Sequence, residues 1–216
     1  MSLFQGRGLS CIRGGRTVFA NLEFAVSKGE VLVLQGPNGS GKSTLLAILA
    51  GLDTVTSGEV FLDDHPLHNL SENERALIRK SSVAFVFQSF ELLPGLTALE
   101  NVMLPSELKY IYNAEEIAKD FLKRVGLEKR LNHYPKQLSG GEQQRVAIAR
   151  AFACKAKVLF VDEPTGNLDS KTGSTISNLF FEVNEESSNA LIVVTHDATL
   201  ASKCDNQIEL REGRII

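Results

Sequence analysis

Residues 36–44 have the types and spacing needed to hold phosphate groups. They read Gly-Pro-Asn-Gly-Ser-Gly-Lys-Ser-Thr and match the pattern G-x-x-x-x-G-K-[ST] in full. Glycines let the backbone bend so that its N–H groups point at phosphate oxygens. Lys42 would reach the β- and γ-phosphates of a nucleotide, and the Ser43 hydroxyl would bind Mg²⁺. A glycine-rich turn before a helix is the alternative, but Lys-Ser-Thr at this offset has little structural purpose. We therefore expect a nucleotide site formed by Gly36, Pro37, Asn38, Gly39, Ser40, Gly41, Lys42, Ser43 and Thr44.

Two adjacent carboxylates follow another apolar run. Val158–Val161 leads directly to Asp162 and Glu163. In open α/β sheets, ligands bind at the carboxyl ends of the strands. We expect Asp162 to hold Mg²⁺ through water and Glu163 to position or deprotonate the attacking water. Such a pair alone would usually be a solvated strand end; together with residues 36–44 it predicts ATP hydrolysis.

Short apolar runs predict the strands that position these groups. Near-continuous runs of Val, Leu, Ile and Phe are typical of parallel sheets covered by helices. The runs are Val31–Leu34, Val83–Phe87, Val158–Val161 and Leu191–Thr195. Helices are expected between them, over residues 43–50, after the capping pair Ser71 and Glu74, over 113–125 and over 142–153. This alternation predicts an α/β core.

The remaining segments predict two additions to that core. Residues 90–149 contain no convincing strand, so we expect an inserted helical subdomain. The first 30 residues and Gly58–Leu62 predict a small N-terminal antiparallel β subdomain. The expected organisation is a single domain over residues 1–216. Its α/β core, with the β subdomain, covers approximately residues 1–88 and 150–216, and the helical subdomain covers approximately 89–149.

Composition narrows the possible classes of protein. The net charge is −3, and basic residues such as Lys119 and Lys123 alternate with acids, so we expect no nucleic-acid partner. The three cysteines are far apart and lack metal-site spacing, which favours a reduced, cytosolic setting. The first 15 residues carry no apolar run of signal-peptide length, and no run is long enough to span a membrane. If the protein acts at a membrane, we expect another protein to cross it.

Further motifs resemble those of ABC ATPases. Leu138-Ser-Gly-Gly-Glu142 is similar to the family's signature motif and stands between the two phosphate motifs. Gln88 resembles the Q-loop glutamine, Asn167-Leu168-Asp169 the D-loop, and His196 the switch histidine. The resemblance covers essentially the whole chain. It implies a P-loop NTPase fold of the RecA-like kind, with a parallel sheet.

The resemblance also implies roles for these residues. In the family, two chains form a head-to-tail dimer with two ATP molecules at the interface. Ser139, Gly140 and Gly141 precede a helix N-terminus, where N–H groups favour anions. The family pattern places them, with Asp169, at the nucleotide held by the other copy. Gln88 would sense Mg²⁺ and the γ-phosphate, and His196 would help to orient the water.

A finer resemblance concerns the membrane partner. Glu163-Pro-Thr-Gly-Asn-Leu-Asp169 resembles the branch with the lipoprotein-releasing LolD type, the macrolide-export MacB type and FtsE. Ser43–Asp53 and Phe85–Phe90 look closest to the YbbA type. This implies a peripheral protein at the cytoplasmic face of a bacterial inner membrane. It also implies an integral membrane permease with an extracytoplasmic domain, in a transporter of lipoproteins or hydrophobic compounds or in a mechanotransmission complex that passes motion across the membrane. Ser89–Leu96 would receive the partner's coupling helix, although core packing explains some of its apolar residues.

Two other functions use the same ATPase residues. One is an FtsE-like regulatory ATPase of a cell-division complex that transports nothing. The other is a soluble ABC ATPase acting on DNA or ribosomes. Such proteins carry long coiled coils or two fused copies, and this chain has neither.

The N-terminus departs from the family pattern at the adenine site. ABC ATPases usually stack the adenine on an aromatic residue about two dozen positions before the phosphate loop. Here Arg13 stands near that position, and a guanidinium can stack on a base. Phe19 is the alternative, as a site residue or as part of the core.

Overall fold

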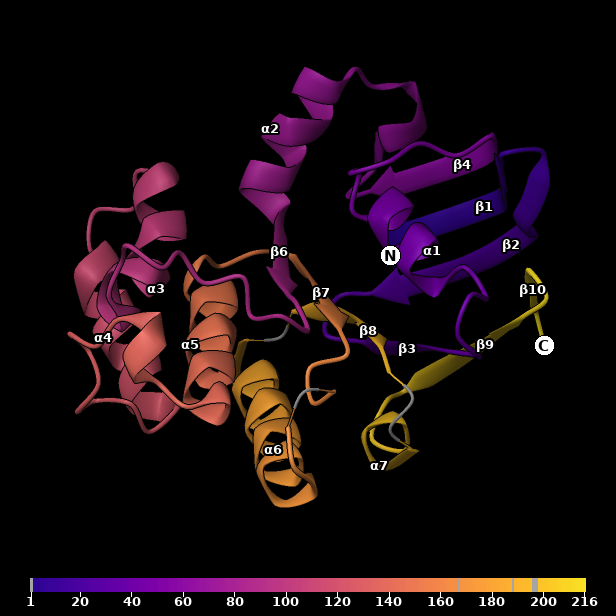
Figure 1. Ribbon diagram of the computed structural model, residues 1–216. Coiled ribbons are helices and arrows are strands. Elements are labelled where there is room, and N and C mark those ends of the chain that lie inside the picture. The colour runs from indigo at the N-terminus through magenta and orange to yellow at the C-terminus, as the bar shows by residue number, and fades with distance from the viewer. Residues whose placement is uncertain (1, 167, 188, 196–197) are drawn as a thin grey trace. The chain divides into compact units, whose positions relative to one another are not determined.

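The structure is a computed structural model that describes residues 2–166, 168–187, 189–195 and 198–216. It divides into two compact units, one formed by Met1–Val83 with Ser188–Ile216 and the other by Ala84–Ser187. Figure 1 labels the elements of both units.

The first unit contains the expected antiparallel sheet. Its strands are β1 (Ser2–Arg13), β2 (Arg16–Ser27), β4 (Ser57–Leu62) and β5 (His65–Pro66), in the order β2-β1-β4-β5. In the long β1–β2 hairpin, Phe4 pairs with Val26 and Cys11 with Phe19, and all four side chains are buried. With β4 paired antiparallel to β1, this sheet is the N-terminal antiparallel subdomain predicted from the sequence.

The first unit also holds a parallel sheet. Strand β3 (Val31–Gln35) runs parallel to both of its neighbours, β8 (Ala190–Val194) and β9 (Asn206–Arg211). The short strand β10 (Arg214–Ile215) pairs antiparallel with β9. Residues 31–34 and 190–194 are buried, as strands covered on both faces must be.

The helices of the first unit follow their sequence signals. They are α1 (Lys42–Leu49), the short η1 (Leu67–Asn69), α2 (Glu72–Ser82) and α7 (Ala198–Ala201). Helix α2 begins with the expected capping box, in which the Glu74 N–H donates to Ser71 Oγ and the Ser71 N–H donates to the Glu74 carboxylate.

The second unit is mainly helical. Its helices are α3 (Ala98–Leu108), α4 (Ala114–Arg124), the short η2 (Pro135–Gln137), α5 (Gly140–Ala153) and α6 (Ser170–Ser187). Helices α3, α4 and α5 lie side by side in Figure 1. Two neighbouring strands complete the unit, β7 (Val158–Asp162) and β6 (Val83–Val86). The boundary between the units falls within β6, because Val83 still belongs to the first unit.

The compact units divide the chain differently from the boundaries expected at 89 and 149. The second unit contains β6, β7 and α6 in addition to the helices of residues 98–153. Helix α6 joins them because it packs on α5, and the Phe152 and Phe180 rings meet edge to face at 5.6 Å.

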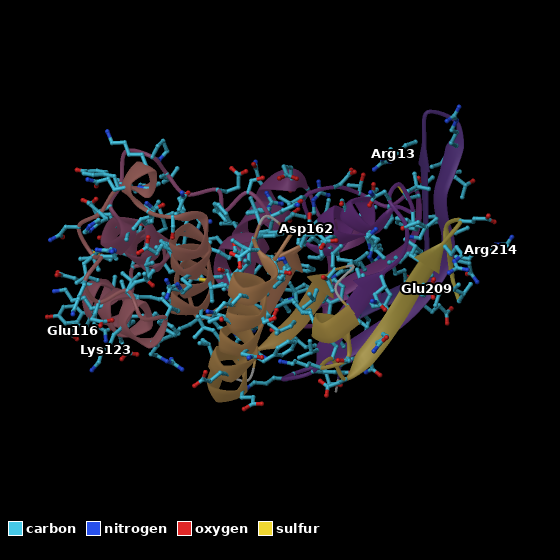
Figure 2. The ribbon with its side chains drawn as sticks, turned by 60° about the horizontal axis from the view of Figure 1, so that its bottom comes forward. Arg13, Glu116, Lys123, Asp162, Glu209 and Arg214 are labelled. Atoms are coloured by element: carbon cyan, nitrogen blue, oxygen red, sulfur yellow. The ribbon has the colours of Figure 1, made fainter. Side chains whose placement is uncertain are left out.

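Helix α4 shows both a solvated face and a missing cap. Its Lys119 pairs with Glu115 at 2.6 Å, and Glu116 and Lys123 are exposed on its surface (Figure 2). The helix follows Asn113 as expected, but the Asn113 side chain makes no capping hydrogen bond. Its ψ of 40° lies far from the extended backbone that side-chain capping requires. No helix within the described ranges is both long enough and apolar enough to span a bilayer.

Candidate nucleotide site

The phosphate loop connects β3 to α1 by a close approach to a neighbouring strand. Gly36 has φ of 142°, and a Cβ atom there would lie 2.1 Å from the Leu210 carbonyl oxygen on β9. Such a distance is impossible for any residue with a side chain. Gly36 therefore fixes the path by which the loop leaves the sheet.

The start of α1 presents positive potential to this loop. Its N-cap, Gly41, makes no side-chain cap hydrogen bond, and the first turn carries no acidic residue. The Lys42 ammonium lies over the loop and donates to the carbonyl oxygens of Gly36 at 2.8 Å and Pro37 at 3.0 Å. Helix N–H groups and an ammonium together suit an anion. The next residue, Ser43, is exposed on the same turn.

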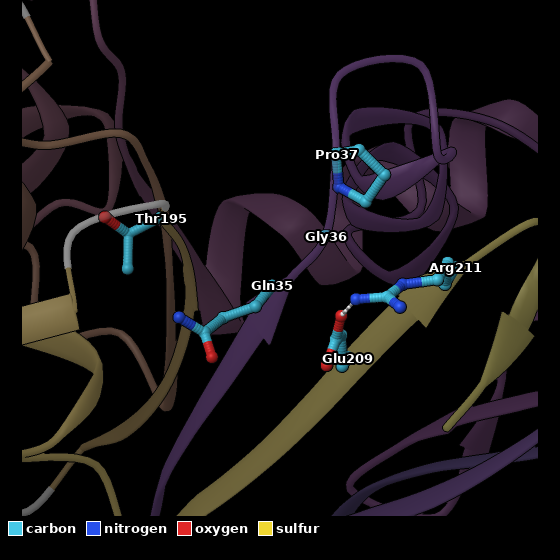
Figure 3. A pocket seen from close by; sticks show the side chains of 6 residues that line it. All are labelled: Gln35, Gly36, Pro37, Thr195, Glu209 and Arg211. Carbon is cyan, nitrogen blue, oxygen red and sulfur yellow. Dashed lines mark hydrogen bonds and ion pairs between the residues drawn. The ribbon is translucent and has the colours of Figure 1, made fainter.

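A hollow of about 550 Å³ lies beside the loop in the same unit. Figure 3 shows the lining residues Gln35, Gly36, Pro37, Thr195, Glu209 and Arg211. Arg211 donates from Nη2 to Glu209 Oε1 at 2.6 Å. These two residues on β9 were not predicted from the sequence. The alternation of buried Ile208 and Leu210 with charged neighbours is the signal that would have shown them.

The carboxylate pair stands where β7 ends. Asp162 is the last residue of the strand (Figure 2), and Glu163 follows it in a left-handed conformation with φ of 45°. The Gly166 N–H donates to the Glu163 carbonyl oxygen at 3.0 Å and closes a turn. A left-handed glutamate is strained, and strain of this kind concentrates at functional sites.

Gln88 lies against this same turn. A Cβ atom built on Gly166 would be 2.8 Å from Gln88 Nε2 and 3.4 Å from Glu163 Cβ. The structure thus brings together three residues of the second unit, of which Gln88 and Glu163 are predicted site residues. Gly166 was missed, because its importance is visible only through the side chain that occupies the space beside it.

The Ser139–Gly141 segment begins helix α5. Ser139 Oγ accepts from the Glu142 N–H at 3.3 Å, and the Ser139 N–H donates to the Glu142 carboxylate at 2.9 Å. Close packing explains why glycine is needed at position 141, since a Cβ atom there would lie 2.8 Å from Thr172 Cγ2 on α6. Gly140 is exposed at the start of the helix. The signature residues therefore cap α5 and let it approach α6.

The carboxylate that completes this capping box is strongly stabilised as an anion. Arg130 Nε donates to Glu142 Oε1 at 2.9 Å, and the Ser139 N–H adds a second hydrogen bond. Together they lower the pKa of Glu142 from 4.5 to about 2. Because the folded-state pKa is lowered, the stabilisation is complete above about pH 4.5 and is lost as the pH falls towards 2.

Replacing Arg130 with methionine tests this ion pair. We expect Arg130→Met to lower the free energy of unfolding at pH 7 by about 1 kcal/mol, because a half-exposed pair is partly screened. Urea unfolding should show the difference from the wild type shrinking as the pH is lowered from 4.5 towards 2. Lys119→Met removes the exposed pair with Glu115 and serves as the control. A pH-independent difference would contradict the assignment.

Asp169, expected to belong to a D-loop, has a capping role. Asp169 Oδ1 accepts from the N–H groups of Lys171 at 3.1 Å and Thr172 at 3.0 Å, at the start of α6. Hydrogen bonds from Thr172 are the main reason that the pKa of Asp169 is lowered. The predicted site residue His196 and the D-loop residue Asn167 lie outside the described residues.

The two residues considered for adenine stacking have different environments. The Arg13 guanidinium donates to Asp53 Oδ2 at 2.7 Å and to the Thr54 carbonyl oxygen at 3.0 Å. Phe19 is completely buried and belongs to the core. Of the two, only Arg13 lies at the surface, and its guanidinium ties the β1–β2 hairpin to the segment after α1.

The segment Ser89–Leu96 is organised by a buried amide that was not predicted from the sequence. Asn101 is 1% exposed, accepts from the Leu93 N–H at 2.8 Å and donates to the carbonyl oxygens of Leu93 and Leu96. Within this segment, the Leu93 side chain is 45% exposed. The segment therefore has a backbone held by hydrogen bonds and an exposed apolar side chain at Leu93.

The expected metal donors suit Mg²⁺. A hydroxyl, a carboxylate and an amide, from Ser43, Asp162 and Gln88, are all oxygen donors of the kind that this hard cation prefers. Among the described residues, no group of three or more His, Cys, Asp or Glu side chains forms a metal cage. Mg²⁺ commonly binds through one or two protein groups plus substrate phosphates, so it does not require a cage of protein ligands.

Comparisons with known proteins agree with this geometry. A family model described as ABC transporter matches residues 19–166. The ABC transporter ATP-binding protein YbbA of Escherichia coli (strain K12) is 54% identical over 201 residues, which is 92% of this chain and 88% of YbbA. The protein MJ1508 of Methanocaldococcus jannaschii, also named as an ABC transporter ATP-binding protein, is 49% identical over 199 residues, covering 91% of this chain and 88% of MJ1508.

Two solved structures of MJ0796 are also similar. One is a dimeric, post-hydrolysis state of this ATP-binding cassette bound to ADP and Pi, and the other is a dimeric structure of MJ0796 as a bacterial ABC transporter cassette. Both have a TM-score of 0.88 and 40% sequence identity, and they cover 98% of this chain and 96% of theirs. The predicted fold class, with its P-loop core and antiparallel N-terminal sheet, is confirmed.

Proposed function

Because this chain belongs to the ABC transporter family and is an ATPase of that family, we propose that it drives a separate membrane subunit through ATP-dependent dimerisation. The observation that carries the proposal is that one chain has two helix starts suited to anions, and that only one of them follows a phosphate loop. The start of α1 has a phosphate loop, and the start of α5 has the Ser139–Gly141 segment.

A head-to-tail pair of identical chains completes both sites. In this arrangement, Ser139, Gly140 and Gly141 of one copy, with Asp169, face the nucleotide held by residues 36–44 of the other. The dimeric MJ0796 structures, one of them bound to ADP and Pi, support this assembly. ATP binding then closes the dimer, and hydrolysis reopens it.

The residues of one chain divide the chemistry among them. Lys42 neutralises charge on the β- and γ-phosphates. A Glu163 oxygen accepts a proton from the attacking water as the water oxygen bonds to the γ-phosphorus and the bond to the bridging oxygen of ADP breaks. Gln88 and His196 orient that water and the γ-phosphate. When bound, Mg²⁺ would neutralise phosphate charge, held by Ser43, by Gln88 and, through water, by Asp162.

Gly166→Ala tests the closeness of Gln88 to the Glu163 turn. The new Cβ atom would displace Gln88 Nε2, which is the end of a flexible side chain. We therefore expect the free energy of unfolding to change by no more than about 1 kcal/mol. ATP turnover should fall about 10- to 100-fold, because catalytic groups tolerate little misplacement. Gly173→Ala is the control, since its Cβ atom would make only ordinary contacts, the nearest at 3.5 Å to Thr165 Cβ. Wild-type turnover in Gly166→Ala would show that the position of Gln88 is unimportant.

We place the membrane partner at the segment after Gln88. Ser89–Leu96 is held by Asn101 and exposes Leu93, so it can receive a coupling segment. The 54% identity to YbbA, named as an ABC transporter ATP-binding protein, supports a transporter subunit as the partner. From the resemblance of residues 163–169 to the LolD, MacB and FtsE branch, we infer a partner with few membrane helices and a large extracytoplasmic domain, as in systems that export lipoproteins or hydrophobic compounds. The protein would then lie peripherally at the cytoplasmic face of a bacterial inner membrane.

Affinity capture tests the partner. A tagged Glu163→Gln chain would be trapped with Mg-ATP in gently solubilised native membranes, and the bound proteins identified by mass spectrometry. Lys42→Ala, which should not close around ATP, is the matched control. We expect a protein with few membrane helices and a large extracytoplasmic domain. A permease with many membrane helices, or ribosomal or DNA-bound proteins alone, would contradict this proposal.

A further inference from the structure

The backbone directly after Gln88 is strained. Phe90 has φ of 63° and Glu91 has φ of 47°, so two consecutive residues other than glycine occupy the left-handed region. Within the turn, the Phe90 N–H donates to the Phe87 carbonyl oxygen at 3.2 Å, and the Glu91 N–H donates to the Ser89 carbonyl oxygen at 2.7 Å. Neither a phenylalanine nor a glutamate favours this backbone. The turn therefore needs support from elsewhere in the fold.

Arg150, on helix α5, supplies that support. Its guanidinium donates from Nη2 to the Phe90 carbonyl oxygen at 2.9 Å and from Nη1 to the Glu91 carbonyl oxygen at 2.6 Å. The two bonds reach both left-handed residues, and the flat fork of an arginine can make them together. Burial lowers the pKa of Arg150, but the guanidinium remains charged at neutral pH, so both bonds are charge-assisted.

The first turn of the same helix lies near the same residue. A Cβ atom at Gly140 would lie 3.8 Å from Cζ of the Phe90 ring and 3.8 Å from Leu168 Cδ2. The Phe90 ring thus lies near the start of α5, and Arg150 bonds the Phe90 carbonyl oxygen near the end of the same helix. A shift of α5 would be passed to the turn through the Arg150 bonds.

We propose that Arg150 is a positioning residue that holds the turn after Gln88 in its strained form and couples it to the signature helix. The inference rests on the proposed function, in which Gln88 meets Mg²⁺ and the γ-phosphate, and the signature residues meet the nucleotide of the second copy. In that setting, the second copy docks on Ser139–Gly141 and moves helix α5. Arg150 passes this movement to the turn and so to Gln88.

Hydrogen exchange of the nucleotide-free chain tests the proposal without depending on activity. In Arg150→Met, which keeps an apolar stem but loses both donors, amides in a peptide covering residues 88–96 should exchange about 10-fold faster or more. Arg150→Lys keeps the positive charge but loses the planar guanidinium that bonds both carbonyl oxygens, so it should give an intermediate exchange rate. Lys109→Met is the control, because its ammonium bonds the Cys154 carbonyl oxygen at the end of the same helix, away from the turn.

A second substitution separates support of the turn from simple packing. Asparagine adopts the left-handed region more readily than most residues, so Glu91→Asn in the Arg150→Met background should slow exchange again. Glu91→Gln removes the same charge, but glutamine has no such preference for the left-handed region, so it should not slow the exchange. Unchanged exchange in Arg150→Met, or equal rescue by glutamine and asparagine, would overturn the proposal.

Turnover measurements then separate this proposal from the role of Gln88. ATP turnover of Arg150→Met should fall towards that of Gln88→Ala, and Glu91→Asn should restore part of it. Fast exchange with wild-type turnover in Arg150→Met, beside an impaired Gln88→Ala, would overturn the coupling. Wild-type turnover in Gln88→Ala would instead refute the proposed role of Gln88, and the exchange rates would still decide whether Arg150 holds the turn.

Discussion

Glu163→Gln is expected to lower the ATP turnover number by about 10²- to 10⁴-fold while leaving ATP binding intact. Glutamine has nearly the shape of glutamate, so the left-handed turn after β7 should persist. It cannot accept a proton from water, however, and the loss should appear in kcat. Steady-state phosphate release and a nucleotide titration measure the two effects separately.

The matched control for this change is Glu182→Gln, an exposed glutamate on α6 in the same unit. It should leave turnover unchanged. Turnover near the wild-type value in Glu163→Gln would show that another group receives the proton. Loss of ATP binding would show instead that the substitution had damaged the fold of the site.

Lys42→Ala is expected to weaken ATP binding by about 100-fold or more, since one well-placed donor to a developing or fixed charge is worth about 3 kcal/mol. The ammonium already lies over the loop, bonded to the Gly36 and Pro37 carbonyl oxygens. Isothermal titration with ATP, with and without Mg²⁺, measures the loss. Because the substitution lies in the first turn of α1, a thermal unfolding measurement of the variant should be made alongside the titration to check that the helix is intact.

Lys28→Ala removes an exposed lysine from the same unit and should not change ATP affinity. If Lys42→Ala bound ATP as tightly as the wild type, residues 36–44 would not be the phosphate site. The hollow lined by Glu209 and Arg211 would then be the next place to look.

The parts of the fold that the sequence predicted are those set by local signals. Val31–Leu34 is a buried apolar run and forms β3 almost to the residue. Ser71 and Glu74 form the expected capping box. The phosphate loop lies between β3 and α1 because its glycines and its Lys-Ser-Thr ending suit only that junction.

The missed elements carry weaker local signals. Helix α6 begins in a run of serine, threonine and glycine, which are poor helix formers, and it is held by the buried stripe Ile176, Phe180 and Val183. Strand β9 is short and charged on one face, and it forms because it pairs with β3. In both cases, packing against another element decides the structure.

The candidate site shows the same division. Motif residues such as Gln88 and Glu163 could be selected from the sequence, whereas their neighbours could not. Gly166 matters because of the side chain that lies against it. Arg150 bonds residues about 60 positions earlier in the chain, and no local pattern indicates that contact. Nothing in the sequence indicated that Arg13 would pair with Asp53.

The central claim is that ATP joins two copies of this chain through a shared site. Light scattering after size-exclusion chromatography of Glu163→Gln, with and without Mg-ATP, tests it most directly. We expect the mass of one chain without nucleotide and of two chains with it. Adding Ser139→Arg should keep the protein monomeric in Mg-ATP while it still binds the nucleotide. A Glu163→Gln chain that binds Mg-ATP and stays monomeric at every concentration, even beside its membrane partner, would contradict the shared site.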